Sequence, residues 1–326
     1  MNKGQDARFM RAAIALSLRG LGRTAPNPNV GCLIVRDDVV VGRGWTHPGG
    51  RPHAEALALA QAEGMTAGAT AYVTLEPCFH LSPRGPRCVE LLERAGIERV
   101  VIAAQDPDPR TNGQSVQWLR EQSIAVETGV MEGAAHGAMG GFFMRQIQGR
   151  PSVTLKLGLS LDGCIAMADG ASRWITGPAA RAHSHVLRAC HDAILVGRGT
   201  WWADAPRLDV RLPGMEERSP RRFLLGHGDA PEGWESIDDP AKVVDIEGIS
   251  SLMIEGGAQT AAAFVAADLV DRIVLYRAPI LIGGGRGAVG DIGLSSLDAA
   301  HGRWRMLDRR MLGVDVMEVY ERMRGG

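Results

Sequence analysis

The sequence predicts an α/β protein made of two consecutive domains. Its 326 residues exceed the roughly 150 residues of a typical domain, and 45% of them are hydrophobic, which is enough for two cores. Helical and β-rich segments alternate along both halves, and this alternation favours sheets covered by helices. In mid-chain, Gly149 and Pro151 interrupt the pattern before a new strand begins. We therefore expect a first domain at residues 1–148 and a second at residues 151–326.

The first half alternates helices with the strands of a mixed sheet. Apolar residues recur at helical spacing near the N-terminus, and two β-rich runs joined by Arg36, Asp37 and Asp38 predict a hairpin. Gly64 and Gly96 end the two helices that follow. The predicted helices span 8–18, 53–63, 89–95 and 118–121, and the predicted strands span 30–35, 39–42, 71–75, 99–104 and 125–128.

The second half continues the alternation with a core of its own. The terminal run 313–320 alternates apolar and polar residues, which predicts an edge or half-exposed strand. No internal repeat links this half to the first. The other predicted strands span 153–157, 193–196, 222–225, 252–254 and 272–276, and the predicted helices span 179–189 and 260–267.

The charge balance favours a small-molecule substrate. The formal net charge is −1, so the composition does not indicate a nucleic-acid or membrane partner. No stretch approaches the ~20 apolar residues of a membrane span, and the N-terminus lacks the features of a cleaved signal peptide. Five cysteines, an odd number, argue against a secreted disulfide framework. We expect a cytoplasmic protein that binds neither nucleic acid nor membrane.

Four residues of the first half have the types and contexts of a catalytic zinc site. His53 and Glu55 stand at the predicted start of a helix, Cys78 follows a strand, and Cys88 opens the next helix. Catalytic zinc takes three protein ligands and a water, and thiolates with an imidazole suit it. His53, Cys78 and Cys88 supply these ligands, while Glu55 can carry protons because it is not a ligand. The pattern resembles the signature of zinc nucleobase deaminases.

Each of these residues alone also has a structural interpretation, as part of a helix turn or as a small buried hydrophobe. Together, in matching contexts, they favour the metal site. Cys32 lies within an apolar strand, and we interpret it as core. Nine residues rather than two separate the zinc cysteines, which disfavours an ordinary cytidine deaminase and places His80, Arg84 and Arg87 over the site.

Signals in the second half are weaker. The glycine cluster at 283–287 fits a turn better than a phosphate cradle, and no G-x-G-x-x-G follows the first strand, so a Rossmann fold is not predicted. Lys156, inside an apolar strand, either extends to solvent or points into a polar site. Asp204 could serve as a cap. Arg207 and Arg211 suit a phosphate group, with a solvated loop as the alternative.

These motifs together resemble one family of bifunctional riboflavin-biosynthesis enzymes. In that family a diaminohydroxyphosphoribosylaminopyrimidine deaminase is fused to a 5-amino-6-(5-phosphoribosylamino)uracil reductase. The matching motifs cover nearly the whole chain. In the first half they are PNPNVG at 26–31, GRPHAE at 50–55 and TLEPCFH at 74–80, with the long loop between the cysteines. In the second half they are LKLGLSLDG at 155–163, SRWITG at 172–177, AILVGRGT at 193–200, DAPRLDVR at 204–211, EGG at 255–257 and PILIGG at 279–284.

The resemblance implies a fold, two reactions and two cofactors. The fold is a cytidine-deaminase-like mixed sheet with helices, followed by a dihydrofolate-reductase-like α/β domain. The reactions are zinc-dependent hydrolytic deamination of a phosphoribosylaminopyrimidine and NADPH-dependent reduction of its ribosyl group to ribityl. The cofactors are Zn²⁺ and NADPH.

The resemblance also implies roles for particular residues beside the three zinc ligands. Glu55 and Asp204 are the implied catalytic residues. The implied substrate contacts are Asn27, His80, Ser172, Arg207, Leu208, Arg211 and Glu255. The implied cofactor contacts are Lys156, Leu159, Trp174, Thr200, Asp204 and Gly257.

The chain departs from the family pattern in three places. Its loop between the zinc cysteines is one residue longer than the usual form. Thr46, with His47 beside it, stands where the family often has a histidine. The segment between Arg211 and Glu255 is short for the family.

Two other functions compete with this interpretation. A zinc deaminase of another nucleobase or nucleoside, with a non-reductase second domain, would share the zinc motif; a nucleic-acid deaminase would also show a basic face. A zinc-stabilised binding protein would close its metal site with four protein ligands and show no turnover. We favour the bifunctional enzyme, and we expect it to be a homo-oligomer, either a dimer or a tetramer.

Overall fold

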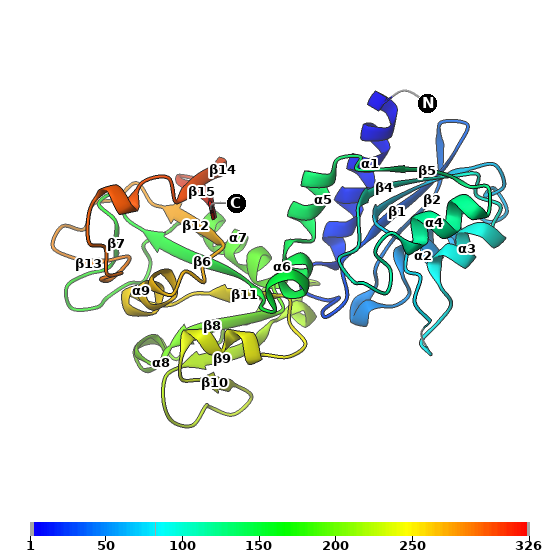
Figure 1. Cartoon of the computed structure of the whole chain (residues 1–326). Helices are drawn as coiled ribbons and strands as arrows, with labels where there is room; N and C mark the ends of the chain where they lie inside the picture. The colour runs from blue at the N-terminus through cyan, green and yellow to red at the C-terminus, as the bar shows by residue number, and fades with distance from the viewer. Residues whose placement is uncertain (1–2, 82, 325–326) are drawn as a thin grey trace. The chain divides into compact units, whose positions relative to one another are not determined.

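The computed structural model describes residues 3–81 and 83–324. The chain divides into two compact units between Gly149 and Arg150. Each unit contains a sheet of parallel and antiparallel strands with helices on its faces, so the predicted α/β class is confirmed (Figure 1). Within the described residues, no helix is both long and apolar enough to cross a membrane.

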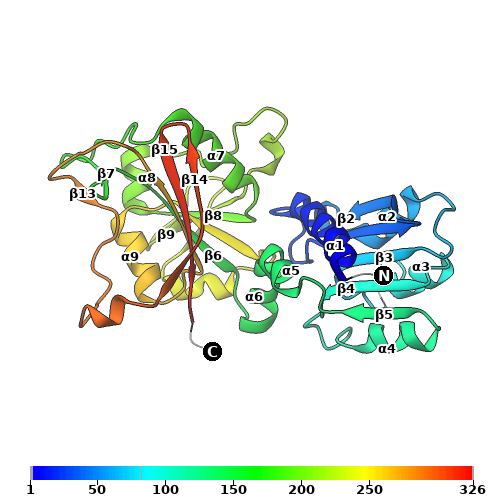
Figure 2. The same ribbon diagram turned by 90° about the horizontal axis from the view of Figure 1, so that it is seen from above.

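The first unit is built on a mixed sheet. Its helices and strands are α1 Lys3–Ser17, β1 Gly31–Arg36, β2 Val39–Trp45, α2 Ala54–Gln61, β3 Thr70–Leu75, α3 Cys88–Arg94, β4 Arg99–Ala104, α4 Gln114–Glu121, β5 Ala125–Thr128, α5 Glu132–Ala138 and α6 Gly140–Gln148. The strand order is β2-β1-β3-β4-β5, with β1 antiparallel to its two neighbours and β3, β4 and β5 parallel. The helices α1 and α5 pack together on one face, and α2, α3 and α4 follow one another on the other (Figure 2).

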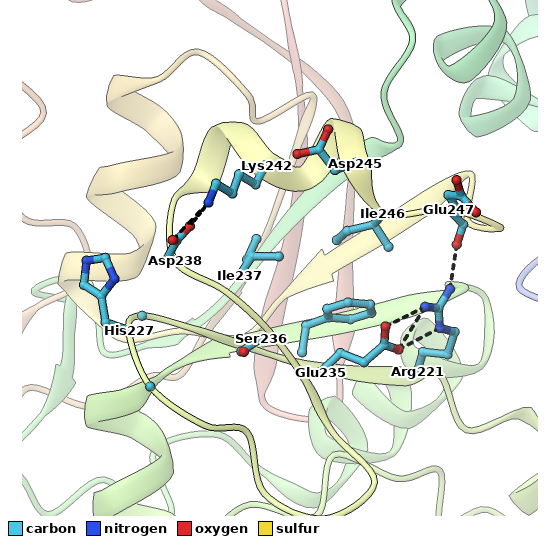
Figure 3. A pocket seen from close by; sticks show the side chains of 13 residues that line it. Arg221, His227, Glu235, Ser236, Ile237, Asp238, Lys242, Asp245, Ile246 and Glu247 are labelled. Carbon is cyan, nitrogen blue, oxygen red and sulfur yellow. Dashed lines mark hydrogen bonds and ion pairs between the residues drawn. The ribbon is translucent and has the colours of Figure 1, made fainter.

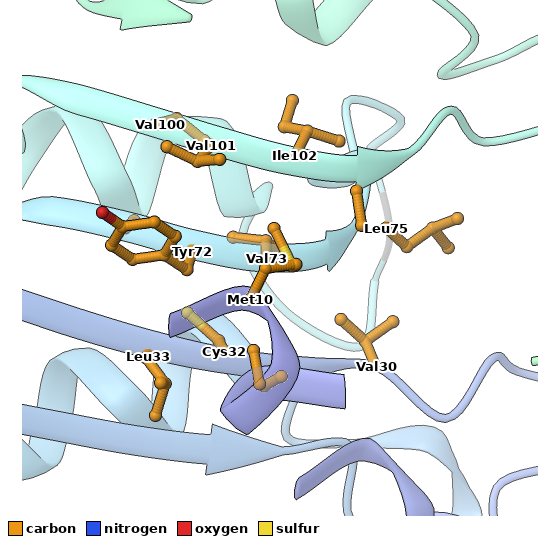
Figure 4. Packing of buried hydrophobic residues seen from close by; sticks show 14 of the residues in the cluster. Met10, Val30, Cys32, Leu33, Tyr72, Val73, Leu75, Val100, Val101 and Ile102 are labelled. Atoms are coloured by element: carbon orange, nitrogen blue, oxygen red, sulfur yellow. The ribbon is translucent and has the colours of Figure 1, made fainter. Parts of the chain in front are cut away.

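Apolar side chains of the central strands form the core of this unit. Tyr72 and Ile102 are fully buried there, and Cys32 has no exposed surface, which confirms it as a core residue (Figure 4). A glycine on β2 lets α2 lie against the sheet, because a Cβ on Gly44 would stand 2.2 Å from the carbonyl oxygen of Ala54. This close approach positions the first turn of α2, which follows the predicted zinc ligand.

The second unit contains a larger mixed sheet. Its elements are β6 Ser152–Leu159, β7 Cys164–Ala166, α7 Pro178–Ala189, β8 Ala193–Gly197, α8 Arg198–Asp204, β9 Arg221–Leu225, β10 Glu235–Ile237, β11 Ser251–Ile254, α9 Ala258–Ala266, β12 Arg272–Arg277, β13 Arg286–Gly287, β14 Trp304–Leu312 and β15 Asp315–Arg322. The strand order is β10-β9-β8-β11-β6-β12-β15-β14, while β7 pairs separately with β13. From β10 to β12 the strands are parallel, and β15 and β14 complete the sheet as antiparallel strands.

Both faces of this larger sheet are covered by helices. Phe264 and Val265 of α9 pack on one face, and Ala180 and Leu187 of α7 pack on the other. The carboxyl ends of the parallel strands therefore meet along one edge, between helices of opposite faces. In open α/β sheets, this edge is where ligands bind.

The end of the chain differs from the prediction. The predicted strand at 313–320 begins only at Asp315, because Gly313 forms a turn with φ of 67°. Its side chains are largely half-buried, but it is not an edge strand, since it lies between β12 and β14. The edge is β14, which was not predicted: a register shift between Met306 and Asp308 breaks its alternation. The helix α8 was also not predicted.

Candidate active sites

The three predicted zinc ligands meet at one end of the first unit's sheet. His53 is the N-cap of α2, Cys78 follows β3, and Cys88 is the first residue of α3. The His53 Nδ1 atom lies 3.2 Å from the Cys88 Sγ and 3.5 Å from the Cys78 Sγ. All three ligand atoms lie within 4.8 Å of one another.

This donor set fits a tetrahedral zinc ion. Zn–S and Zn–N bonds of about 2.3 and 2.1 Å give a tetrahedron with edges of ~3.6 Å, close to the separations of the imidazole from the two sulfurs. The backbone N–H of Cys88 donates to the Cys78 Sγ at 3.3 Å. Hydrogen bonding from the Cys88 thiol, together with the nearby His53 imidazole, lowers the pKa of Cys78 to about 4. A thiolate, the form that binds metal, is therefore stabilised before any ion arrives.

Glu55 lies next to this cluster on the first turn of α2. Only 3% of its surface is exposed, and this burial raises the pKa of its carboxyl above the ordinary value. A carboxyl that takes up a proton more readily suits a group that must accept and return one during a reaction. The location of Glu55 beside the three ligands thus suits a proton carrier.

Other predicted residues of the first unit lie in the segment before His53 or in the loop between the two cysteines. Asn27 packs on Gly50, where a Cβ would stand 2.0 Å from the Asn27 Nδ2; the φ of 83° at this position also favours glycine. Arg84 donates to the carbonyl of Gly49 at 2.8 Å, which connects the long loop between the cysteines to the segment at Gly49 and Gly50. His80 lies 3.4 Å from the Thr111 hydroxyl.

Two further residues of this region have structural partners. Arg87 forms an ion pair with Glu90 and lies over the ring of Phe79. Its guanidinium is therefore engaged by these two partners. Thr46, at the position where the family often has histidine, is buried and accepts a hydrogen bond from the Val30 amide at 3.0 Å.

In the second unit, Lys156 and Glu255 meet on the face of the sheet covered by α7. The Lys156 Nζ lies 3.4 Å from the Glu255 Oε2. Of the two interpretations left open for Lys156, the structure supports the one in which it points into a polar site. Arg188 of α7 completes the cluster, with its Nε 2.7 Å from the Glu255 Oε1 and its Nη2 3.0 Å from the Oε2.

The charges of this cluster explain the state of Glu255. Burial, the largest single effect, raises the pKa of Glu255, but Lys156 and Arg188 together outweigh it and lower the pKa to about 2. Glu255 is therefore ionised and cannot donate a proton at neutral pH. Arg188 was not among the predicted site residues. The one sequence signal is the spacing of three between His185 and Arg188, which places both side chains on the same face of a helix. In the structure, both contact the Asp209 carbonyl.

The segment after α8 carries several of the predicted residues. Asp204 is the last residue of α8, and its Oδ1 lies 3.4 Å from the Nη2 of Arg173. Arg207 and Arg211 both form ion pairs with Asp209. Leu208 between them is 3% exposed and anchors the segment in the core, so it does not offer a free side chain.

The remaining predicted residues have varied surroundings. Thr200 and Gly257 come together, because a Cβ on Gly257 would lie 3.7 Å from the Thr200 Oγ1. Trp174 is largely exposed, with the Arg181 guanidinium 4.7 Å from its ring centre, and Ser172 is half-buried in the same segment. Leu159 is a buried core residue, so only its backbone could contact a cofactor.

The glycine cluster at 283–287 behaves as a turn. The amide of Gly283 donates to the Asp162 Oδ2 at 2.7 Å, and the amide of Ile282 donates to the Oδ1 at 3.2 Å. These amides therefore hold a carboxylate of the protein itself. This favours the turn interpretation over a phosphate cradle.

Comparisons with known proteins match each of the two units to a different family model. Residues 3–104 match the family model of the cytidine and deoxycytidylate deaminase zinc-binding region, and residues 151–244 and 239–317 match that of the RibD C-terminal domain. The riboflavin biosynthesis protein RibD of Escherichia coli (strain K12) is 37% identical over 361 residues, covering 96% of this chain and 98% of the relative. RibD of Aquifex aeolicus is 36% identical over 330 residues, covering 90% and 92%.

Solved structures show the same similarity over the whole chain. Acinetobacter baumannii RibD (form 1) superposes with a TM-score of 0.87 at 36% identity, covering 99% of this chain and 100% of that one. A Thermotoga maritima protein described as a diaminohydroxyphosphoribosylaminopyrimidine deaminase/5-amino-6-(5-phosphoribosylamino)uracil reductase superposes with a TM-score of 0.88 at 29% identity, covering 98% and 99%.

Together, the site and the comparisons define an enzyme with a deaminase domain of the zinc-binding type and a reductase domain. The chain belongs to the RibD family of riboflavin biosynthesis proteins. It is a bifunctional deaminase and reductase that acts on a small molecule, which confirms the predicted function. The alternative, a deaminase of another nucleobase with a non-reductase second domain, is not favoured. The two domain types imply zinc and a nicotinamide cofactor.

Proposed function

We propose that residues 1–148 deaminate a phosphoribosylaminopyrimidine hydrolytically, and that residues 151–326 then reduce its ribosyl group to ribityl with NADPH. The observation that carries this proposal is the cluster of His53, Cys78 and Cys88 with the buried Glu55 beside it. Support for the second step comes from the buried charge cluster around Glu255, which lies in a separate unit with its own sheet.

In the first reaction, the protein holds the metal and moves protons. His53, Cys78 and Cys88 would hold zinc, which when bound acidifies a water and so supplies the nucleophile. Glu55 accepts one proton from the attacking water and passes it to the ring nitrogen. It then accepts the remaining proton of the added hydroxyl and passes it to the departing amine, which leaves as ammonia. Asn27 and His80 are the proposed pyrimidine contacts.

In the second reaction, the protein orients two ligands and balances their charge. NADPH, when bound, supplies the hydride that reduces the imine form of the opened ribosylamine. We assign Lys156, Trp174, Thr200, Asp204, Gly257 and the backbone of Leu159 to the cofactor, and Ser172, Arg207, Arg211, Glu255 and the backbone of Leu208 to the substrate. Asp204 is the proposed proton-handling residue. The two arginines already share Asp209, so a phosphate would bind their remaining N–H groups.

The zinc assignment predicts one metal ion per chain. Changing Cys88→Ser removes a thiolate ligand while keeping the size and the helix start, so we expect zinc content to fall to a small fraction and ammonia release to fall with it. Metal analysis of the purified full chain measures this. Full zinc occupancy in the variant would show that Cys88 is not a ligand. The matched control is Cys164→Ser, because Cys164 is also a buried free cysteine but belongs to the second unit.

We also propose that the enzyme is a cytoplasmic homo-oligomer. None of its five cysteines forms a disulfide, as expected in a reducing compartment. The edge strand β14 exposes Met306, Leu307 and Met311, which could pair with a second copy. Sedimentation equilibrium of the full chain tests the oligomer, and a monomer at micromolar concentration would refute it.

A further inference from the structure

The segment 172–177 carries two residues that we assign to the reductase site, Ser172 and Trp174. It lies between β7 and α7, outside any strand or helix, so no regular element fixes its position. Residues that contact a ligand from such a segment depend on the groups that hold it, because a displacement of about 1 Å can cost roughly 100-fold in rate. The anchors of this segment therefore bear directly on the reductase reaction.

Two arginines contact the segment from its outer side. Arg173 donates from its Nη2 to the Asp204 carbonyl at 3.1 Å. Arg181 of α7 donates to the Thr176 carbonyl, and its guanidinium lies 4.7 Å from the ring centre of Trp174. Because Arg173 is exposed, water competes for its contact, which therefore holds the start of the segment only weakly.

The end of the segment is held from inside the protein by Asp315. The Gly177 amide donates to the Asp315 Oδ2 at 2.7 Å, and only 1% of Asp315 is exposed. Gly177 is also the N-cap of α7, so the same contact fixes the start of that helix. A Cβ on Gly177 would stand 3.1 Å from the same carboxylate oxygen, so the two groups are closely packed.

The topology of the sheet brings Asp315 to this segment although it lies 138 residues after Gly177. Asp315 is the first residue of β15, which runs antiparallel to β12. Its neighbour Val316 pairs with Arg277, the last residue of β12. β15 therefore begins at the carboxyl edge of the parallel strands, where ligands bind in open α/β sheets.

The second oxygen of Asp315 makes this residue costly for stability. The Oδ1 atom is buried and has no hydrogen-bond donor, and no cation pairs with Asp315, within the part of the chain that the structure describes. By contrast, two carboxylates at the pocket of about 630 Å³ beside β9 and β10 each have a cation, Glu235 with Arg221 and Asp238 with Lys242 (Figure 3). A buried oxygen without a partner costs free energy, and natural proteins accept such costs mainly at functional sites.

We propose that Asp315 is a positioning residue for the reductase reaction. By accepting the hydrogen bond of the Gly177 amide, it fixes the segment 172–177 and the start of α7. Ser172 is thereby held against the substrate and Trp174 against the cofactor, while Asp315 itself contacts neither ligand. The inference rests on the proposed function, because it takes Ser172 and Trp174 as contacts of the reductase site.

Changing Asp315→Ala in the full-length chain removes the acceptor of the Gly177 amide. We expect kcat/KM for NADPH oxidation to fall roughly 10- to 100-fold, with a higher KM and a higher Kd for NADPH, because the contacting segment is no longer fixed. Calorimetry measures the Kd without turnover. Hydrogen exchange should become faster in the segment 172–177 and stay unchanged in β8. Ammonia release should also stay unchanged, because the zinc cluster lies in the other unit.

Two further variants test the contact even if Asp315→Ala does not fold. Asp315→Asn keeps an oxygen that can accept from the Gly177 amide, so its KM and Kd for NADPH should stay within about threefold of wild type. Gly177→Ala acts from the other side: its φ of −72° suits alanine, but the added Cβ would crowd the Asp315 oxygen, so KM and Kd should rise. In the double variant Gly177→Ala/Asp315→Ala the two losses should not add, because both act through one contact.

Asp192 provides the matched control. Its Oδ2 accepts hydrogen bonds from the amides of Ser250 and Ser251, each at 2.9 Å, so it is also a carboxylate that binds backbone N–H groups. It lies at the amino ends of β8 and β11, at the opposite edge of the sheet from the proposed site. Asp192→Ala should lose stability, while the KM and Kd for NADPH of its folded fraction stay those of wild type.

Defined results would overturn the inference. If the Asp315→Ala and Gly177→Ala variants that fold kept the wild-type KM and Kd for NADPH, Asp315 would have a structural role alone. The same conclusion would follow if Asp315→Asn lost as much as Asp315→Ala, if exchange rose equally throughout the second unit, or if the losses added in the double variant. Wild type that releases ammonia but binds no NADPH would instead refute the proposed reductase function, so the two failures are distinguishable.

Discussion

Replacing Glu55 by glutamine is expected to lower the rate of ammonia release by roughly 10³–10⁴-fold, the upper range for loss of a general acid–base group. The variant should keep its zinc, because Glu55 is not one of the three ligands. Glutamine preserves the size of the side chain and can still hydrogen-bond, but it cannot accept a proton. Metal analysis and an ammonia assay on the same full-length preparation measure both effects.

A matched control separates proton transfer from a general effect of charge near α2. Glu63 is an exposed carboxylate just beyond the other end of that helix. Glu63→Gln should therefore release ammonia at the wild-type rate. Near wild-type turnover in Glu55→Gln would contradict the role given to Glu55, and loss of zinc would show that the residue supports the metal instead.

Replacing Glu255 by alanine is expected to destabilise the second unit by about 3–5 kcal/mol, because Lys156 and Arg188 would remain buried without a counter-charge. The same change should abolish reduction of the deaminated substrate, because it removes the carboxylate that holds Lys156 and Arg188 together in the proposed reductase site. Denaturant unfolding and NADPH absorbance measure the two effects.

The pH dependence of this contribution has a definite sign. The folded pKa of Glu255 is about 2, below the ordinary 4.5, so the carboxyl holds its proton less tightly in the folded protein. Its contribution to stability is therefore fully present above pH 4.5 and is lost as the pH falls from 4.5 towards 2. Wild type should lose this increment over that range, whereas Glu255→Ala should not.

Glu318 provides the control for Glu255. It is also a largely buried carboxylate, with Arg277 at 3.2 Å and Arg309 at 3.8 Å, but it lies on β15 and has no assigned role. Glu318→Ala should lose stability while NADPH oxidation by the folded fraction stays unchanged. If both variants lost oxidation equally, the effect of Glu255 would be one of stability alone.

Local motifs account for what could be predicted of the zinc site. His53 and Glu55 lie at the start of one helix, Cys78 follows a strand, and Cys88 begins the next helix. Short stretches of sequence are therefore enough to predict these four residues as a site. Each zinc ligand lies at a boundary between a loop and a regular element. Such boundaries are marked in the sequence by proline and by changes in periodicity.

The second site depends on contacts between residues far apart in the chain. Lys156 and Glu255 meet only because β6 and β11 are neighbours, so the sequence alone left two interpretations of the lysine open. Arg188 was missed because a cation on an amphipathic helix usually faces solvent, and here α7 turns it towards the sheet. Arg198 donates a hydrogen bond to the carbonyl of Gly226, 28 residues later, and no local pattern indicates this contact.

The central claim is that one chain carries two separate sites that act in sequence. The most direct test incubates the full-length protein with the phosphoribosylaminopyrimidine and follows ammonia and NADPH absorbance in the same sample. We expect one ammonia released and one NADPH oxidised per substrate, with ammonia first. Asp204→Asn should leave ammonia release unchanged and slow only NADPH oxidation. If wild type released ammonia but never oxidised NADPH, or if Asp204→Asn slowed both reactions equally, the assignment of two separate sites would be wrong.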